Sequence, residues 1–308
     1  TITADVDDLA GNSATQATDS TTKDTTPPTI SVAINDGGDG RLNAAEDGSV
    51  TISGTTSGIP NGQTVAINIS SSAGGTPINT TATTGSNSYS LSNLDLSSLD
   101  DGTLTITADV SDLAGNAATQ ASTSTTKDSS SPTISVAIDD GGDGRLNAAE
   151  DSSVTISGVT SGAPDGQTVA INISSSGGDT PFNTTATVSN NRYSLSNLDL
   201  SSLDDGTLTI TADVSDLAGN AATQASTSTT KDSSSPTISV AIDDGGDGRL
   251  NAAEHSSVTI SGVTSGAPDD QTVSISITDG SNTVTTSARV ASNTSVSYTH
   301  LRAHETAY

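Results

Sequence analysis

The 308-residue chain is strongly acidic, with 36 Asp and Glu residues against 9 Lys and Arg residues and a formal net charge of −27. Such a surface repels nucleic-acid phosphates and anionic lipid headgroups and attracts cations, which argues against nucleic-acid and membrane-surface binding. The chain has no Cys for disulfides. Its apolar runs stay well short of the roughly 18 residues that a membrane-spanning helix needs.

The chain repeats itself. Residues 89–150 recur letter for letter as residues 193–254, at an offset of 104 residues. A period of this length is too long for one turn of a solenoid and suits a whole small domain. The sequence therefore predicts a tandem array of a truncated repeat, two full repeats, a second truncated repeat and a tail, at residues 1–25, 26–129, 130–233, 234–295 and 296–308.

Each full repeat contains short runs in which apolar and polar residues alternate. In the second repeat there are seven such runs, at residues 133–138, 153–157, 168–174, 183–188, 192–195, 207–214 and 221–229. Gly, Asn, Asp, Ser and Pro separate them, and no stretch has helical periodicity. This pattern predicts an all-β fold made of tandem immunoglobulin-like β-sandwich domains, with antiparallel strands that turn one face inward.

The linkers between repeats are short, at residues 23–28, 127–132 and 231–236. Pro28, Pro132 and Pro236 stiffen the approach to the first strand of each repeat. Short, stiff linkers favour a rod over flexible beads, so we expect a monomeric rod in which the partners are neighbouring repeats of the same chain.

The segment 296–308 departs from the repeat pattern and holds two of the three His residues of the chain. We interpret it as a non-native tail. The alternative is a metal site formed by His300 and His304.

A loop between the first two strands of each repeat matches a calcium-binding template. In the second repeat residues 139–150 read DDGGDGRLNAAE. A calcium loop of the EF-hand kind places oxygen ligands at positions 1, 3, 5, 7, 9 and 12, with Gly at position 6. Position 3 does not match, because Gly141 has no side-chain oxygen, although Asp140 is a substitute. The candidate Ca²⁺ ligands are Asp139, Asp140, Asp143, Asn147 and Glu150; Asp36, Asp39, Asn43 and Glu46; and Asp243, Asp244, Asp247, Asn251 and Glu254. The alternative is a Gly-rich hairpin loop in which Asp and Asn serve only turn geometry.

Two further sets of acids are candidates. A turn of sequence DxxDLAGN lies between the last two strands and supplies Asp109, Asp112, Asp213 and Asp216. It is either a ligand cluster or a tight turn in which Gly115 or Asn116 adopts positive φ. The linker acids are Asp24, Asp128 and Asp232, whose alternative role is simple solvation.

Strand direction predicts where these groups meet. Successive strands of a sandwich alternate in direction, so the DGGDG loop lies at one end of a repeat and the DLAGN turn at the other. Stacking repeats end to end makes the loop of one repeat face the turn of the next, with the linker Asp between them. We expect calcium there to neutralise carboxylates that otherwise repel one another.

These motifs resemble bacterial immunoglobulin-like tandem repeats of giant RTX adhesins, including the calcium-dependent extender repeats of a marine ice-binding adhesin. The resemblance rests on the AGN turn, the PTISV strand and the DGGDGRLNAAE loop. It implies type I secretion, a location at the bacterial cell surface, and a role as a spacer that calcium stiffens.

Two other functions were considered. A module that binds a glycan or protein is the alternative to the spacer, but aromatic residues make up only 2% of the chain, and we expect Tyr89 and Tyr193 to pack at the sandwich edge. An enzyme is not expected. His255 occurs in one copy only, and the paired acids Asp100 and Asp101 lie in a polar turn.

Overall fold

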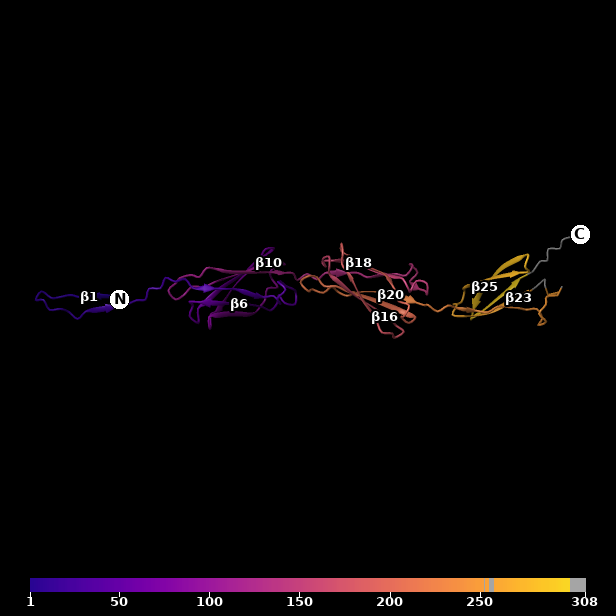
Figure 1. The fold of residues 1–308 in the computed structure, drawn as a ribbon, viewed down its shortest axis with the longest axis horizontal. Helices are drawn as coiled ribbons and strands as arrows, with labels where there is room; N and C mark the ends of the chain where they lie inside the picture. The colour runs from indigo at the N-terminus through magenta and orange to yellow at the C-terminus, as the bar shows by residue number, and fades with distance from the viewer. Residues whose placement is uncertain (252, 255–257, 300–308) are drawn as a thin grey trace.

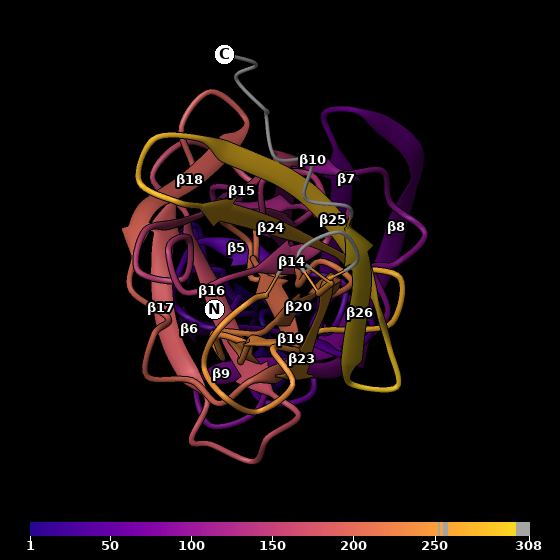
Figure 2. The ribbon, with the colours of Figure 1, turned by 90° about the vertical axis from the view of Figure 1, so that its right-hand side faces the viewer.

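The computed structural model describes residues 1–251, 253–254 and 258–299, and the regular structure of these residues is all β-strand. We use first, second and third unit for the parts at 26–129, 130–233 and 234–299. Figure 1 shows the N-terminal hairpin and the three units in a row, with the hairpin and the third unit at opposite ends. Figure 2 looks along this row, so the units lie one behind another. Within the described residues no helix is long and apolar enough to cross a bilayer.

The strand bounds show the repetition. The N-terminal hairpin has β1 (Ile2–Ala4) and β2 (Ala17–Asp19). The first unit has β3 (Thr29–Ile30), β4 (Ala33–Asn35), β5 (Arg41–Leu42), β6 (Val50–Ser57), β7 (Thr64–Ser71), β8 (Gly74–Thr83), β9 (Ser88–Leu94), β10 (Gly102–Asp109) and β11 (Ala121–Lys127). The second has β12 (Thr133–Ile134), β13 (Ala137–Asp139), β14 (Arg145–Leu146), β15 (Val154–Ser161), β16 (Thr168–Ser175), β17 (Phe182–Thr187), β18 (Arg192–Leu198), β19 (Gly206–Asp213) and β20 (Ala225–Lys231). The third has β21 (Thr237–Ile238), β22 (Ala241–Ile242), β23 (Val258–Ser265), β24 (Thr272–Thr278), β25 (Thr283–Ala291) and β26 (Thr294–Thr299).

Each full unit is a sandwich of two sheets. In the first unit one sheet has the order β5-β11-β10-β7-β8, and the other is built on β6, which pairs with β3, β4 and β9. The second unit repeats this with β14-β20-β19-β16-β17 and a sheet built on β15. The predicted immunoglobulin-like, all-β class is confirmed.

The pairing differs from the predicted all-antiparallel pattern at one place. β5 pairs with β11 in parallel, and β14 pairs with β20 in the same way. These two-residue strands lie inside the predicted calcium loop. They are too short to give an alternation signal in the sequence.

The predicted first strand of each unit is divided into two short strands. In the second unit the run at 133–138 becomes β12 and β13, and both pair with β15. Between them, the carbonyl of Ser135 accepts a 2.6 Å hydrogen bond from the hydroxyl of Tyr193. A Cβ at Gly158 would lie 2.0 Å from the same carbonyl. The Tyr193 hydroxyl therefore satisfies the Ser135 carbonyl where the pairing with β15 is interrupted. Because this carbonyl lies so close to Gly158 of β15, that position requires glycine.

The core of each unit follows the period-2 alternation, because successive strand residues point to opposite faces. In the first unit Val65, Ile67 and Ile69 of β7 are buried against Leu104 and Ile106 of β10. The second unit has a separate core with the equivalent residues. Tyr89 and Tyr193 are buried, as expected from their strand positions, and burial raises the pKa of Tyr89 to about 12.

The third unit ends differently from the predicted boundary. β26 runs to Thr299 and pairs with β23, in the place that β9 and β18 take beside β6 and β15. Four residues assigned to the tail, 296–299, are therefore part of a strand. At the other end of the chain, the short strands β1 and β2 pair antiparallel, and all their residues are exposed. The candidate metal pair His300 and His304 lies outside the described residues.

Candidate calcium loops and the junction between units

The acids of the DGGDG loop build its turns. In the second unit the Asp140 carboxylate accepts the Gly142 N–H at 3.2 Å, and the Asp143 carboxylate accepts the Arg145 N–H at 2.9 Å. The loops of the other units contain the same hydrogen bonds. These are Asx-turns, in which a side chain imitates a backbone turn. Turn formation is thus a role that these acids fill in the structure.

The last acid of the loop folds back over the residue at position 3. Glu150 Oε1 lies 3.1 Å from the place that a Cβ would occupy on Gly141, which has φ +74°. Glu46 and Glu254 make the same approach to Gly37 and Gly245, at 3.0 and 3.1 Å. The other oxygen of Glu150 accepts the Asn147 N–H at 3.0 Å. Position 3 therefore suits glycine for two reasons: its φ lies in the left-handed region, and a Cβ there would crowd the carboxylate of position 12.

Asp140 also joins the loop to the last strand of its unit. Its Oδ2 accepts a hydrogen bond of 2.9 Å from the hydroxyl of Thr229, and Asp36 accepts the same bond from Thr125. Asp140 is therefore an anchor for the loop as well as a turn former.

The loop has the oxygen donors that Ca²⁺ prefers, and Glu150 closes it over its start. In the part of the chain that the structure describes, however, no three Asp, Glu or His side chains are grouped as a metal site. The donor chemistry therefore fits calcium, whereas the arrangement of the acids fits turn formation.

The turn acids point into their own hairpin. In the first unit Asp112 accepts both the backbone N–H and the side-chain amide of Asn116 at 2.8 Å, and these bonds, the side-chain bond first, lower the pKa of Asp112. Asp109 accepts the side-chain amide of Gln120 at 2.8 Å. Gly115 has φ +90°, and Asn116 is not in the positive-φ region. In the second unit Asp216 accepts the equivalent bonds from Asn220, and Asp213 accepts the side-chain amide of Gln224.

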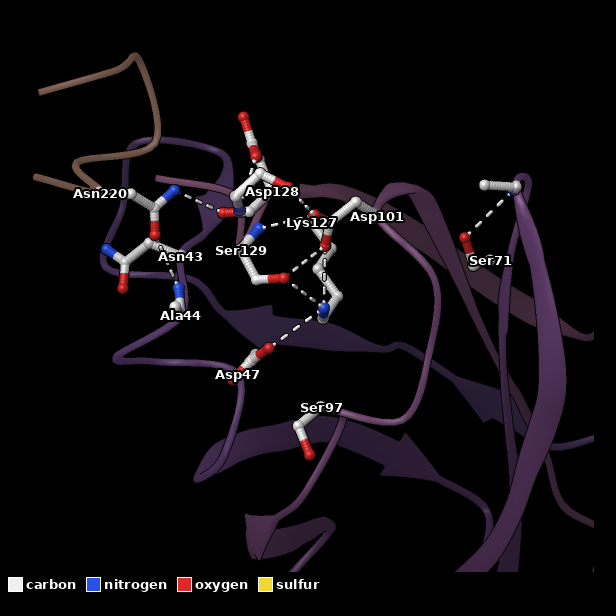
Figure 3. Close-up of polar contacts among 12 residues, drawn as sticks. Asn43, Ala44, Asp47, Ser71, Ser97, Asp101, Lys127, Asp128, Ser129 and Asn220 are labelled. Atoms are coloured by element: carbon white, nitrogen blue, oxygen red, sulfur yellow. Dashed lines mark hydrogen bonds and ion pairs between the residues drawn. The ribbon is translucent and has the colours of Figure 1, made fainter. Parts of the chain in front are cut away.

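The loop of the first unit contacts the turn of the second unit, as the strand directions predict (Figure 3). Asn43 Nδ2 donates to the carbonyl of Ala218 at 2.9 Å, and Asn220 Oδ1 accepts the Ala44 N–H at 3.0 Å. Asn220 Nδ2 donates to the carbonyl of Asp128 at 2.7 Å. One side chain thus joins the first unit, the linker and the second unit.

The linker acids take part in hydrogen bonds within and beside their linkers. At this junction Asp128 supplies its main-chain carbonyl, and its carboxylate accepts the Ser130 N–H at 3.2 Å. Asp24 and Asp232 make the corresponding turns with Thr26 and Ser234. The carbonyl of Asp24 likewise accepts the side-chain amide of Asn116, at 3.4 Å.

A buried ion-pair network next to the junction was not predicted (Figure 3). Lys127 is 2% exposed, and its Nζ lies 3.1 Å from Asp47 Oδ2 and 2.9 Å from Asp101 Oδ1. Asp101 also accepts the Ser129 N–H and hydroxyl at 3.0 and 2.9 Å, which ties the start of the linker to the sandwich. In the second unit Lys231 takes the same place between Asp151 and Asp205.

The charges in this network favour their ionised forms. Burial alone raises the pKa of Asp101, but the hydrogen bonds from Lys127 and from the serines after it are stronger together and lower it to about 2. Burial likewise lowers the pKa of Lys127, and Asp101 and Asp47 reverse this and raise it. The sequence signal was a lysine at the first position of each linker in a chain with few cations: Lys23, Lys127 and Lys231.

No protein-family model matches the chain, and no match is found among the curated proteins. Solved structures do match. A tetra-tandem repeat from the extending region of a large adhesion protein is 29% identical, over 96% of this chain and 71% of that one, with a TM-score of 0.36. A Ca²⁺-stabilized adhesin with which an Antarctic bacterium binds ice is 27% identical, over 96% and 72%, with a TM-score of 0.46. A 1.5-MDa bacterial ice-binding adhesin is 26% identical, over 90% and 88%, with a TM-score of 0.41. The chain is thus similar to tandem repeats of large bacterial adhesins, as its motifs suggested.

Proposed function

We propose that this chain is a spacer that holds other parts of a secreted bacterial surface adhesin at a distance, with repeats at residues 26–129 and 130–233 as its building blocks. The observation that carries the proposal is the contact of Asn220 with Ala44 and Asp128. It joins consecutive units end to end, which is what a rod requires and what a flexible string lacks.

Repulsion between carboxylates opposes this end-to-end arrangement. The loop of the first unit, the turn of the second unit and the linker between them all carry acids, and these three segments meet at the junction. Each carboxylate pair at about 4 Å costs roughly 1 kcal/mol in water, and several times more where it is partly buried. A divalent cation between them reverses the sign of this term.

We propose Ca²⁺ for this role, with the acids of the DGGDG loops as first ligands. In the first loop these are Asp36, Asp39, Asn43 and Glu46. On this proposal the turn and linker acids contribute mainly through their charge. Ion binding then fixes the loop that carries Asn43 and Ala44, and this stiffens the contact with the next unit.

The expected affinity is that of an extracellular module, with a dissociation constant of about 10⁻⁴–10⁻³ M. With calcium about tenfold above that constant, each site adds about 1.4 kcal/mol to the free energy of unfolding. Several sites matter for units whose cores consist mainly of Val, Ile, Leu and Ala.

The test is X-ray scattering and thermal unfolding of the chain at fixed ionic strength, first with Ca²⁺ and then with a chelator. We expect calcium to raise the melting temperature. We also expect it to stiffen the rod, so that its maximum dimension becomes better defined. Glu46→Gln should reduce the calcium response of the first unit, and Asp19→Asn, which removes an exposed charge of the N-terminal hairpin, should not. If the melting temperature and maximum dimension of the wild type are the same with and without calcium, the proposed role of calcium is wrong. If the particle is flexible in both conditions, the proposed spacer function is wrong.

A further inference from the structure

A sequence triplet of the two full units matches the acceptor for an N-linked sugar. The acceptor is an Asn followed two residues later by Ser or Thr, with any residue except Pro between them. Five such triplets occur in the chain, and they start at Asn68, Asn79, Asn172, Asn183 and Asn293. The first four form two equivalent pairs, one in the first unit and one in the second.

The two Asn of each pair lie opposite each other on neighbouring strands. Asn68 of β7 pairs with Asn79 of β8, and Asn68 Nδ2 donates a hydrogen bond of 2.8 Å to Asn79 Oδ1. Asn172 of β16 makes the same bond to Asn183 of β17. The Asn on the inner strand thus uses its side-chain nitrogen in this bond, whereas the Asn on the outer strand uses its oxygen. The outer Asn therefore keeps its nitrogen, the atom to which a sugar is attached, out of the bond.

A second contact of the outer Asn is compatible with a sugar. Asn183 Nδ2 donates to the carbonyl of Pro181 at 3.3 Å. The side-chain amide has two N–H groups. A sugar replaces one of them, so the other can still donate to this carbonyl.

The outer strands are also the accessible ones. β8 and β17 are the last strands of their sheets, beside β7 and β16. Residues two apart in a strand point to the same face, so the amide of Asn79 and the hydroxyl of Thr81 lie side by side, and both residues are exposed. Figure 2 shows β8 and β17 on the outside of the row of units, on opposite sides. A transferase therefore has access to each triplet from the flank of the rod.

A polar hollow adjoins the outer Asn of the second unit. It has a volume of about 610 Å³, and its lining includes Asn172, Asn183, Thr185 and Asp213. Amide, hydroxyl and carboxylate groups are hydrogen-bond partners for the hydroxyls of a sugar. The first sugar ring on Asn183 therefore has both space and polar partners on the face of the sheet.

The edge of the first unit lacks charge. Residues 48–94 contain no Asp, Glu, Lys or Arg, although the chain has a net charge of −27. Proteins commonly protect an exposed edge strand from pairing with other chains by charged side chains or by Pro. On β8, Pro77 removes one N–H group from the edge. A bulky, hydrophilic sugar on Asn79 would provide the protection that charge provides elsewhere.

We propose that Asn79 and Asn183 are N-glycosylation sites. In the reaction Nδ2 forms a bond to the anomeric carbon of a sugar, and the bond from that carbon to a diphosphate leaving group breaks. The diphosphate leaves with the bonding electrons, and a proton of Nδ2 passes to a base of the transferase. The co-reactant is thus a sugar activated by a diphosphate at its anomeric carbon. Both Asn lie within edge strands and outside the DGGDG loops, so the modification does not require calcium.

Mass spectrometry of the protein purified from the cells that produce it tests the proposal. We expect peptides that contain Asn79 or Asn183 to exceed their sequence mass by one or more sugar residues, with fragmentation placing the sugar on these two side chains. Asn68 and Asn172 should be unmodified, because they are only partly exposed and their nitrogens donate across the strands. The same chain made in a bacterial host without an N-glycosyltransferase provides the unmodified reference.

Variants made in the producing cells separate the triplet from its surroundings. Thr81→Ala removes the hydroxyl of the triplet and keeps Asn79, so it should lose the sugar on Asn79 and retain the one on Asn183. Thr81→Ser should retain both sugars. Thr83→Ala is the matched control, because Thr83 is the next exposed Thr on the same face of β8 and lies outside the triplet.

Three results would overturn the proposal. One is a protein from its own cells in which Asn79 and Asn183 are both unmodified. Another is a sugar that remains on Asn79 in the Thr81→Ala variant. The third is modification of Asn68 and Asn172 alone, since it would mean that neither the strand edge nor the free nitrogen selects the acceptor.

Discussion

Lys127 Nζ lies 3.1 Å from Asp47 Oδ2, and both side chains are almost completely buried. The lysine ends the last strand of the first unit, and the aspartate follows its DGGDG loop. This ion pair therefore joins the calcium-loop segment to the strand that leads into the linker, with Asp101 as the second carboxylate.

The first prediction concerns this lysine. Lys127→Ala leaves Asp47 buried without its cation, so we expect the free energy of unfolding of the first unit to fall by about 3–5 kcal/mol. The double variant Lys127→Met/Asp47→Leu fills the same space without any buried charge of this pair. It should therefore lower the free energy of unfolding by less than Lys127→Ala does. Urea unfolding measures both.

Lys23 is the matched control, because it occupies the same place in the repeat but is exposed, in the segment after the N-terminal hairpin. Lys23→Ala should change the unfolding free energy of the units by less than about 0.5 kcal/mol. Similar losses for the two alanine variants would show that burial of the pair is not what matters.

The second prediction concerns acid. The folded-state pKa of Asp101 is lowered from 3.8 to about 2. A lowered carboxylate pKa stabilises the fold above the unfolded-state value, and the contribution is lost as the pH falls from about 4 towards 2. Solvent screens part of this effect, since the Asp101 side chain is 32% exposed. In urea unfolding at a series of pH values, Asp101→Asn should lose this part of the acid dependence. Asp100→Asn, at the exposed neighbour, should keep it.

The strands of the sandwich could be predicted from the sequence because alternation with period 2 is a local signal. It located β15, β16 and β19 within a few residues. The two-residue strand β14 gave no such signal. The break between β12 and β13 depends on a hydrogen bond from Tyr193, 58 residues away, which no local pattern contains.

The junction could be predicted because strand direction alone places loop and turn at facing ends. The role of each acid could not be predicted from the sequence, because Asp and Asn use the same side-chain oxygens in Asx-turns and in calcium ligation. The Lys127 network was missed because Asp47, Asp101 and Lys127 are distant in sequence and meet only after both sheets have formed.

The third prediction separates strain from ligand geometry in the loop. Gly141 and Gly142 both have positive φ, at +74° and +85°. An alanine at either position should cost about 1–2 kcal/mol of stability, because the left-handed region disfavours a Cβ. Only at Gly141 does the new Cβ also meet the Glu150 carboxylate.

Calcium titration followed by thermal unfolding distinguishes these effects. We expect Gly141→Ala to weaken the calcium response of the second unit more than Gly142→Ala, at a similar stability without calcium. If the two variants respond to calcium alike, then Glu150 does not need its place over Gly141, and the proposed ligand set loses its closing residue.

The last prediction concerns the side chain that joins two units. Asn220→Ala removes the hydrogen bonds to Ala44 and Asp128, each worth about 0.5–1.5 kcal/mol, together with a bond to Asp216 inside its own turn. Asn116→Ala is the matched control, since Asn116 makes the same internal bond to Asp112 but bonds only to the linker outside its unit. The distance between spin labels on Cys residues introduced at the exposed positions Thr81 and Thr185 measures the junction, because the chain has no other Cys. Asn220→Ala should broaden the distance distribution between the first and second units, and Asn116→Ala should leave it as in the wild type. Equal widths in all three proteins would mean that the short linker alone, and not the Asn220 contact, sets the angle between units.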